Sequence, residues 1–381
     1  MSKLEQLINE LCPNGVEFKK IKSSYTRIKG TPITAGKMKE IASDDGEIKI
    51  FAGGKTVITA HEADIPNANI TRVPAVLVQS RGVIDAVYYD KPFTFKNEMW
   101  AYTADNPIKV KYLYYVLKNN IEHFREAASG MGSLPQISLR VTEDFIIPLP
   151  PLPVQEEIVR ILDKFTELTA ELTAELTAEL TARKQQYEYY RDRLFANYKS
   201  APKKKLIEVA DISRGIRVVK KQLISNGNYP VYQNSLAPMG YYDKYNCNGN
   251  TTYVISAGAA GEIGYCETNF WAADDCLFFS NLREINNKYI YYFLLTKQDF
   301  IYSNVRKASI PRLSRIVIEN LQIPIISIGE QEQVVNLLNR FDKLCNDISE
   351  GLPAEIEARQ KQYAYYRDKL LTFKKKEATE K

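Results

Sequence analysis

Two stretches of the chain have the apolar spacing of long helices. From Gln155 to Phe195 there is neither glycine nor proline, which allows about 60 Å of uninterrupted helix at 1.5 Å per residue. A second stretch begins at Glu330. Its apolar residues follow the alternating steps of four and three that are typical of a coiled-coil seam: Val334, Leu338, Phe341, Cys345, Ile348 and Leu352. Gly351-Leu352-Pro353 interrupts this seam, so we expect a kink or break there.

The rest of the chain alternates short runs rich in Val, Ile and Tyr with glycine turns such as 52–55. Such runs predict strands. Four prolines between 148 and 153 predict an extended elbow before the first helix, because proline fixes φ and lacks an N–H. We therefore predict an α/β (α+β) fold with mixed sheets in two globular parts, at about 18–147 and 203–323.

The sequence repeats itself. ARKQQYEYYRDRL (182–194) and ARQKQYAYYRDKL (358–370) lie 176 residues apart and are identical at nine of thirteen positions. The same offset joins Ser133-Leu134-Pro135 to Ser309-Ile310-Pro311, and YLYYVLK (112–118) matches YIYYFLL (289–295) at an offset of 177. Upstream of about residue 110 the halves resemble each other only loosely. The two halves therefore share a common scaffold, and we expect them to differ in a surface formed by the segments upstream of about residue 110.

This duplication predicts two similar globular domains separated by two long antiparallel coiled-coil helices in a pseudo-twofold arrangement. The junction after the first helix resembles the C-terminus followed by the N-terminus, so the chain looks cyclically permuted and its two ends should lie near each other. The predicted parts are an N-terminal segment, a first recognition domain, a central spacer helix, a second recognition domain, a C-terminal spacer helix and a tail: 1–17, 18–153, 154–199, 200–329, 330–375 and 376–381.

Residues 169–180 read TAEL three times. Ala, Glu and Leu are strong helix formers, so this run predicts helix. Leu168, Leu172, Leu176 and Leu180 recur every four residues, and each step of four turns the helix by about 400°. The apolar seam must therefore rotate here. Each tetrad adds about 6 Å, which would make the run an adjustable strut; the alternative is a low-complexity helical spacer.

Composition narrows the class of protein. The net charge is +5, which permits a polyanionic partner without requiring one. The sequence has 25 Tyr against 2 Trp and 2 His, and its five cysteines form no CxxC pair, so neither a zinc site nor a disulfide framework is indicated. Neither a signal peptide nor an apolar run long enough to span a membrane is visible. A cytoplasmic location is expected.

The usual catalytic motifs do not occur in the sequence. It contains no phosphate-binding GxxxxGK[ST] loop and no NPPY-type amino-methyltransferase motif. His61 and His123 lie in unrelated contexts, and Asp274-Asp275 is more typical of a turn than of a carboxylate pair. We therefore predict no catalytic residue and no metal site in this chain.

The sequence resembles the DNA-specificity subunits of type I restriction–modification enzymes, nearest the type IC subfamily. The resemblance is carried by PLPPLPVQEEIVRILDKFTEL (148–168), the TAEL tetrads, ARKQQYEYYRDRLF (182–195) and their second copies. It implies a non-catalytic, DNA-binding subunit that recruits two adenine-methyltransferase subunits, to which motor–nuclease subunits are added. S-adenosylmethionine, ATP and Mg would be used by those partners. Each recognition domain would read one half of a split, asymmetric double-stranded DNA target, and the helices would set the unread gap.

Residues that contact DNA should be Arg, Lys, Thr, Asn or Gln in loops. In the first half the candidates are Arg27, Lys29, Thr31, Lys55, Arg72, Arg81 and Arg140. In the second half they are Arg214, Arg217, Lys220, Gln233, Asn234, Tyr242, Arg312 and Arg315. Arg214-Gly215-x-Arg217 is the favoured motif, because glycine permits close backbone approach and arginine suits a guanine edge. For any single residue the alternative is an ordinary solvated charge.

A surface that binds the same partner twice should be alike in both halves. By that criterion the methyltransferase-binding candidates are Gln155, Tyr187, Tyr189, Tyr190 and Arg191, with Gln331, Tyr363, Tyr365, Tyr366 and Arg367. The alternative for them is ordinary packing of a helix pair. Two other functions stay open on the residues alone: a duplicated coiled-coil adaptor that binds proteins rather than DNA, and an autonomous nuclease or methyltransferase, which the missing motifs disfavour.

Overall fold

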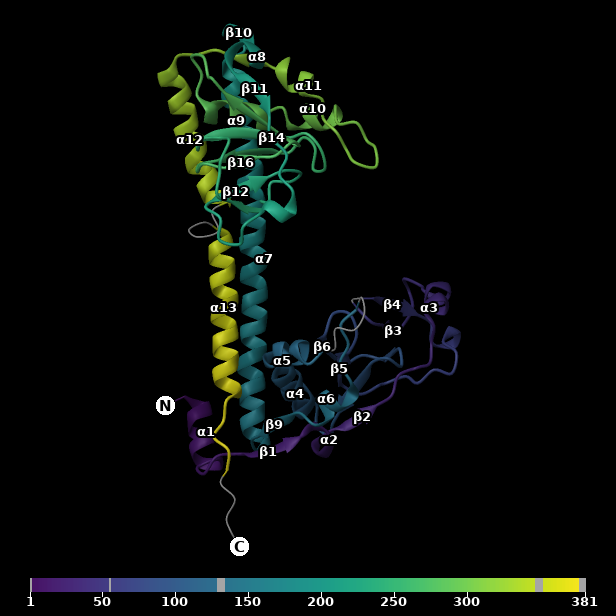
Figure 1. The fold of residues 1–381 in the computed structure, drawn as a ribbon. Helices are drawn as coiled ribbons and strands as arrows, with labels where there is room; N and C mark the ends of the chain where they lie inside the picture. The colour runs from purple at the N-terminus through teal and green to yellow at the C-terminus, as the bar shows by residue number, and fades with distance from the viewer. Residues whose placement is uncertain (1, 55, 129–133, 347–351, 377–381) are drawn as a thin grey trace. The chain divides into compact units, whose positions relative to one another are not determined.

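The computed structural model describes residues 2–54, 56–128, 134–346 and 352–376. The chain divides into two compact units. Unit 1 comprises Met1–Thr173 and Glu357–Lys381, and unit 2 comprises Ala174–Ile356. Figure 1 labels the helices and strands of both units.

Unit 1 contains a four-stranded sheet in the order β2-β8-β5-β6, a three-stranded sheet in the order β4-β3-β7, and the pair β1-β9. Its strands are β1 (Glu17–Lys20), β2 (Thr26–Ile28), β3 (Ile48–Phe51), β4 (Val57–Ala60), β5 (Ala75–Gln79), β6 (Asp85–Tyr89), β7 (Phe93–Phe95), β8 (Trp100–Thr103) and β9 (Ile146–Leu149). Its shorter helices are α1 (Lys3–Leu11), α2 (Ile21–Ser24), α3 (Ala35–Ile41), η1 (Glu62–Asp64), α4 (Pro107–Asn119), α5 (Ile121–Glu126) and α6 (Leu139–Glu143).

Unit 2 contains a four-stranded sheet in the order β11-β17-β14-β15, a three-stranded sheet in the order β13-β12-β16, and the pair β10-β18. Its strands are β10 (Lys203–Lys205), β11 (Asp211–Arg214), β12 (Tyr229–Tyr232), β13 (Gly240–Tyr242), β14 (Thr251–Ile255), β15 (Ile263–Cys266), β16 (Trp271–Ala272), β17 (Cys276–Ser280) and β18 (Gln322–Pro324). Its shorter helices are α8 (Leu206–Val209), η2 (Lys220–Gln222), α9 (Asn287–Leu295), α10 (Gln298–Ser303) and α11 (Arg315–Glu319).

The sheets of the two units have the same strand order, well beyond the segments in which their sequences match. In each three-stranded sheet the middle strand pairs antiparallel with one neighbour and parallel with the other (β3 with β4 and β7; β12 with β13 and β16). The expectation of α/β parts with mixed sheets is confirmed. Upstream of residue 110 the two halves resemble each other only loosely in sequence, but their strands are arranged in the same order there as well.

The two predicted helical stretches form three helices, α7 (Leu152–Asn197, 46 residues), α12 (Ile328–Asn346) and α13 (Leu352–Leu371). Helix α7 continues through the TAEL run without a break, as predicted. Leu168, just before that run, is 45% exposed, and Leu176 within it is only 8% exposed, which agrees with a rotating apolar seam. In the second stretch Val334 and Leu338 are buried as the seam predicts, whereas Ile348 and Gly351 lie outside the described residues.

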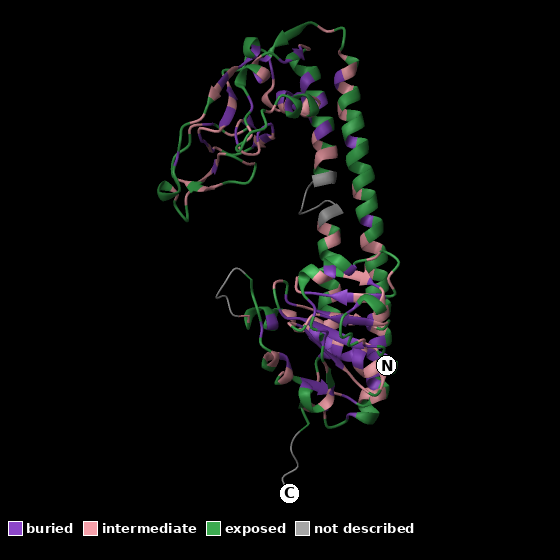
Figure 2. Ribbon diagram, turned by 90° about the vertical axis from the view of Figure 1, so that its right-hand side faces the viewer, coloured by how far each residue is buried: buried purple, intermediate pink, exposed green. Residues whose placement is uncertain are grey.

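Within each unit, part of α7 packs against a second helix. In unit 1 the Phe165 ring lies 6.0 Å from the Tyr366 ring of α13, and the Thr166 and Tyr363 hydroxyls are 2.9 Å apart. In unit 2 the Tyr190 ring stacks on Phe341 of α12 at 6.0 Å. Figure 2 shows that most of α7 is exposed and that buried residues concentrate in the sheets.

Segments close to the two chain ends meet in unit 1. The Val16 N–H donates to the Lys374 carbonyl at 2.9 Å, and the Lys376 N–H donates to the Val16 carbonyl at 2.9 Å. Leu4 and Leu371 belong to the same buried cluster. The proximity of the ends that the permuted repeat predicts is therefore confirmed.

Tyrosines of α4 and α9 form much of the two main cores. Tyr112, Tyr289 and Tyr292 are fully buried, and Tyr115 is 3% exposed. The Tyr112 hydroxyl donates to the Pro148 carbonyl at 3.2 Å, and the Tyr289 hydroxyl donates to the Pro324 carbonyl at 3.3 Å. These contacts join each helix to its elbow strand. Among the described helices none combines the length and the apolar character that a bilayer crossing requires.

Candidate nucleic-acid and partner interfaces

A glycine follows the first strand of each four-stranded sheet, where two backbones nearly touch. A Cβ on Gly30 would lie 2.1 Å from the Phe95 carbonyl oxygen, and a Cβ on Gly215 would lie 2.2 Å from the Ala272 carbonyl oxygen. Both positions therefore require glycine for packing. The close backbone approach that the sequence predicts at Gly215 is made by the protein's own backbone at Ala272.

Three loops of unit 2 meet through backbone hydrogen bonds. The Ala259 N–H donates to the Asn234 carbonyl at 2.9 Å, and the Gly258 N–H donates to the Pro311 carbonyl at 3.2 Å. Ala257 and Arg312 form an isolated antiparallel bridge. The loop after β14 is thus held between the loop after β12 and the segment before α11.

The corresponding loops of unit 1 meet in the same way. The Gly54 N–H donates to the Arg81 carbonyl at 3.0 Å, and the Gly82 N–H donates to the Pro135 carbonyl at 2.8 Å. Arg81 and Gln136 form the bridge that corresponds to Ala257 and Arg312. Pro135 and Pro311, which end the repeated Ser-x-Pro sequences, therefore precede equivalent bridges in the two units.

Four of the predicted DNA-contacting residues line one groove of unit 2. The groove has a volume of about 490 Å³, and its lining includes Arg217, Lys220, Gln233 and Asn234. Arg217, Lys220 and Asn234 are exposed. Two cations and two amides converge here on an open surface, which is the chemistry that phosphate and base-edge contacts require.

Two arginines adjoin this edge without an acidic partner. Arg306 and Arg312 pair through backbone hydrogen bonds of 2.8 and 3.1 Å, and neither side chain has an ion pair within the described part of the chain. Arg315, three residues further on, is bound to Glu319 at 2.8 Å. The structure therefore separates Arg312, which is available to an anion, from Arg315, whose charge is already compensated.

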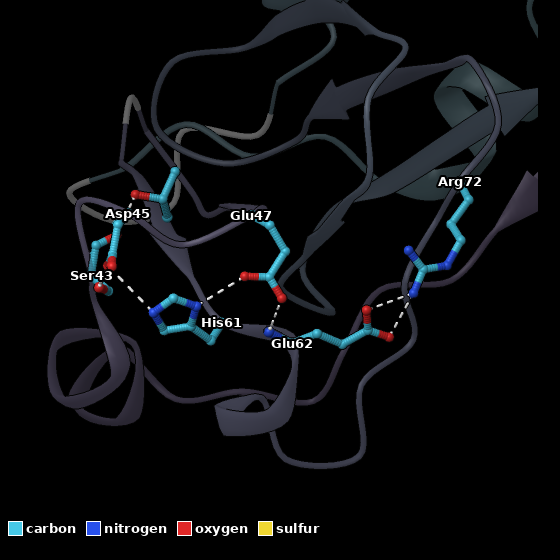
Figure 3. A network of polar contacts seen from close by, with 7 residues as sticks. Ser43, Asp45, Glu47, His61, Glu62 and Arg72 are labelled. Carbon is cyan, nitrogen blue, oxygen red and sulfur yellow. Dashed lines mark hydrogen bonds and ion pairs between the residues drawn. The ribbon is translucent and has the colours of Figure 1, made fainter.

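Several predicted residues of unit 1 are held by acidic neighbours. Arg27 lies 3.6 Å from Glu143. The Arg72 guanidinium binds both carboxylate oxygens of Glu62, at 2.6 and 2.7 Å (Figure 3). Lys29 and Arg140 are both exposed.

One predicted residue of unit 1 is buried, and another lies outside the described residues. Thr31 is fully buried, and its hydroxyl lies 2.7 Å from that of Thr94 and accepts the Asn69 N–H at 2.9 Å. Thr31 therefore fixes a loop in the core and is not placed to contact DNA. Lys55 lies outside the described residues.

Arg214 and Tyr242 also have structural partners. The Arg214 Nε donates to the Asp274 carbonyl, and its Nη2 lies 3.6 Å from Asp275. Tyr242 packs edge-on against Trp271 at 5.2 Å. Arg214 thus anchors the turn before β17, which leaves Arg217 as the arginine of the favoured motif that faces the groove.

The matched residues of the helix pairs divide into a buried and an exposed set. Gln155 and Gln331 are buried and donate to the Pro150 and Ile326 carbonyls at 2.7 and 2.9 Å. These glutamines therefore close the elbows and are not placed to bind a partner. Arg191 lies 5.7 Å from the Tyr187 ring, and Arg367 lies 5.4 Å from the Tyr363 ring; Tyr187 itself is buried.

Four tyrosines remain exposed at matched positions. Tyr189 and Tyr190 are 58% and 41% exposed, and Tyr365 and Tyr366 are 64% and 41% exposed. Their rings meet in pairs at 5.6 and 5.4 Å. Each unit therefore presents the same aromatic pair beside an arginine, which suits a recurring protein contact.

Titratable groups in the described residues give no sign of a reactive centre. Burial raises the pKa of the Cys247 thiol to about 12 and raises that of Cys276 well above its ordinary value, so both thiols stay protonated in the core. The hydrogen bond with Glu47, 3.0 Å away, raises the pKa of His61 (Figure 3). No group of three or more potential metal ligands occurs within the described ranges.

Sequence reasoning missed the bridge position of Gln136. Its counterpart Arg312 lies 176 residues later, so the repeat offset would have identified the pair (136 and 312). It also missed a cation–aromatic contact that both units share: Lys111 lies over Tyr88 at 5.4 Å, and Lys288 lies over Tyr265 at 4.7 Å.

Comparison with protein families gives a match over most of the chain. Residues 18–182 and 199–358 match a model described as the type I restriction modification DNA specificity domain. A putative type I restriction enzyme specificity subunit of Haemophilus influenzae is 33% identical over 306 residues, which cover 74% of this chain and 77% of that protein. The EcoR124I/EcoR124II specificity subunit of Escherichia coli is 30% identical over 368 residues, which cover 88% and 89% of the two chains.

Solved structures show the same fold. The type I restriction–modification S subunit from M. genitalium has a TM-score of 0.52 at 19% identity and matches 94% of this chain and 96% of its own. A chain from a structural study of assembly and conformational transition of the type I R-M system has a TM-score of 0.60 at 15% identity and matches 94% and 98%. At these identities the likeness concerns the fold alone.

Proposed function

The chain belongs to the family of type I restriction–modification DNA specificity subunits, and from this premise we propose that it reads a bipartite, asymmetric double-stranded DNA target, one half-target with each unit. As a specificity subunit it is the non-catalytic component of its enzyme. The observation that carries the proposal is the contrast within the chain: two units of one topology bear different residues at their loop edges. A single scaffold used twice with different edges suits a target whose two halves differ.

The proposed DNA-contacting surface of unit 2 is the groove with Arg217, Lys220, Gln233 and Asn234, together with Arg312. In unit 1 it is the corresponding edge with Arg81, together with the exposed Lys29 and Arg140; Lys55, which lies outside the described residues, stays a candidate from the sequence. Arg27, Arg72, Arg214, Arg315 and Tyr242 are bound to neighbours in this conformation and would make weaker or secondary contacts.

We further propose that the exposed tyrosine pairs 189–190 and 365–366, with Arg191 and Arg367, bind two identical adenine-methyltransferase subunits. The matched geometry supports this, because one partner surface can recognise both copies. Motor–nuclease subunits would join that complex in the cytoplasm. S-adenosylmethionine, ATP and Mg would be bound by these partners.

The TAEL run supports assignment to a type IC-like subfamily, in which α7 would act as an adjustable spacer. Each tetrad corresponds to about 6 Å of helix, and the run is uninterrupted helix. Deleting one tetrad should therefore shorten the preferred gap and leave both half-target sequences unchanged. A change in the half-target sequences would contradict this role.

A direct test is to co-express the chain with the methyltransferase subunit of its host, measure the complex by native mass spectrometry, and sequence the methylated sites on a randomised DNA library. We expect two methyltransferases per chain, a split motif, and binding that weakens steeply with salt. A single contiguous motif, or none, would favour the adaptor function instead.

Variants of the exposed tyrosines test the partner surface separately. Tyr189→Ala and Tyr365→Ala should each remove one methyltransferase from the complex, because each truncates one aromatic pair. Tyr245→Ala is the matched control, since Tyr245 is 45% exposed but lies in the globular part of unit 2. Two methyltransferases retained in both tyrosine variants would place the partner surface elsewhere.

A further inference from the structure

We propose that the bridge between the loop after β5 or β14 and the Ser-x-Pro segment is a base-reading position in each unit: Arg81 with Gln136 in unit 1, and Ala257 with Arg312 in unit 2. This inference rests on the proposed function and names the residues that distinguish one half-target from the other.

The backbone around the two bridges is the same. The Ile137 N–H donates to the Ser80 carbonyl at 3.0 Å, and the Leu313 N–H donates to the Ser256 carbonyl at 2.8 Å. Gly82 and Gly258 follow at φ values of +80° and +84°, a conformation that other residues rarely adopt. The serine, the glycine and the proline are thus shared, and they hold the bridge in one geometry in both units.

The side chains on this common frame differ. Arg81, Gln136 and Arg312 are exposed, whereas Ala257 is 2% exposed. Residues opposite each other in an antiparallel pair project from the same face, so each unit presents one arginine there, from the β5 loop in unit 1 and from the Ser-x-Pro segment in unit 2. A position that determines which base is recognised needs a constant backbone geometry and a side chain that can differ, and both conditions are met here.

The charges at this position favour an anionic or acceptor-rich ligand. Neither Arg81 nor Arg312 has an ion pair within the described ranges, and Arg312 is also bridged by the backbone to a second cation, Arg306. Arg27, Arg72 and Arg315, by contrast, bind Glu143, Glu62 and Glu319.

The chemistry of the bridge side chains specifies the readout. Arginine binds the O6 and N7 acceptors of guanine through two hydrogen bonds, and glutamine suits adenine. Arg312 would therefore read a guanine of the unit 2 half-target, with Arg306 on a nearby phosphate. In unit 1 Arg81 would read a guanine, and Gln136 would favour an adenine next to it.

The test uses the complex of the full chain with its methyltransferase subunits and the same randomised library. Arg312→Gln should relax the preference at one base pair of one half-target and weaken binding to the original target about tenfold, within the range expected for losing a bidentate pair. The other half-target and the gap should not change. Ala257→Arg combined with Arg312→Gln, which copies the unit 1 pair, should restore a preference at that base pair.

Arg283→Gln is the matched control, because Arg283 is an exposed arginine of unit 2 that is bound to Asp211 and is not among the predicted DNA-contacting residues; its motif should equal that of the unchanged chain. A uniform loss of affinity for all sequences in Arg312→Gln would mean a phosphate contact and overturn the inference, as would an unchanged motif. Failure of the proposed function is distinguishable, since the unchanged chain would then methylate or bind no split motif at all.

Discussion

Corresponding contacts in the interiors of units 1 and 2 are the same, although the sequences around them differ. The Tyr115 hydroxyl donates to Asp163 at 2.6 Å, and the Tyr292 hydroxyl donates to Asn339 at 2.7 Å. The hydrogen bond has been kept while the charge of its acceptor has changed. The elbow contacts of Tyr112 and Tyr289 are likewise equivalent.

The loop edges of the two units differ where their interiors agree. Unit 2 gathers Arg217, Lys220, Gln233 and Asn234 in one groove, whereas Arg72 of unit 1 is compensated by Glu62. The difference separates two classes of residue by a physical criterion. Under the proposed function, positions with the same contacts in both units would maintain the fold or contact the common partner, and positions with different side chains on a common backbone would contact the two different half-targets.

The largest expected effect comes from the shared interior. Tyr112→Ala and Tyr289→Ala should each destabilise their own unit by about 3–5 kcal/mol, because each removes a fully buried ring and leaves a cavity. The two tryptophans allow each unit to be followed alone: Trp271→Phe leaves Trp100 of unit 1 as the reporter, and Trp100→Phe leaves Trp271 of unit 2.

Urea unfolding of these single-tryptophan chains, followed by fluorescence, provides the measurement. We expect similar shifts for the two tyrosine variants, each confined to its own unit. If one variant shifted both transitions equally, or if the two costs differed several-fold, the interiors would not be energetically equivalent.

A second prediction concerns the close backbone approaches. Gly30→Ala and Gly215→Ala should each cost about 1–3 kcal/mol, because the added methyl group would overlap a carbonyl oxygen. Gly36→Ala and Gly329→Ala are the controls: the nearest atom to a Cβ at Gly36 is 4.0 Å away, and none lies within 4 Å at Gly329. The same single-tryptophan chains serve for the measurement. If the controls were as destabilising as the test variants, helix propensity or local strain other than overlap would be responsible.

Gly30 and Gly215 also show which features of the fold can be predicted from the sequence and which cannot. The long helix follows from the absence of Gly and Pro, and the matched tyrosines follow from the constant offset of 176 or 177. Gly30 and Gly215 are 185 residues apart (30 to 215), because the loops between strands differ in length, so the equivalence of the sheets was hidden. The two glycines can be recognised as equivalent only from the strands that they pack against in the folded structure.

The candidate site was predictable in type and only partly in position. The sequence predicts loop cations as the class of residue that contacts DNA, yet the ion pairs of Arg72 and Arg315 and the burial of Thr31 depend on partners elsewhere in the fold. Thr31 binds Thr94, which lies 63 residues away in the sequence. Local patterns carry no information on such pairs, because they form only when distant strands come together.

A third prediction sharpens the contrast between the loop edges. Arg217→Ala should weaken DNA binding by about 1–3 kcal/mol at fixed salt, the range of a good base contact. Arg72→Ala should have a much smaller effect, because the Arg72 guanidinium is already held by Glu62. Fluorescence anisotropy with a labelled target measures both, and Trp271, whose Nε1 donates to the Ile216 carbonyl beside the groove, provides a second signal. Equal losses in the two variants would mean that the intramolecular ion pair gives way to DNA.

The smallest expected effect is a pH dependence of stability that should appear in unit 1 and not in unit 2. Both histidines of the chain belong to unit 1, and His61 lies 3.0 Å from Glu47 and 3.3 Å from Asp45 (Figure 3). The Glu47 hydrogen bond, assisted by the Asp45 charge, raises the pKa of His61 above 6.5. A group whose pKa is higher in the folded than in the unfolded state stabilises the fold fully at pH values below its unfolded-state pKa. This stabilisation is lost as the pH rises through the folded-state pKa.

The urea midpoint reported by Trp100 should therefore fall slightly between about pH 5.5 and about pH 8. His61→Gln should remove that fall, and Trp271 should report none; a fall that persists in His61→Gln would assign the pH dependence to other groups of unit 1.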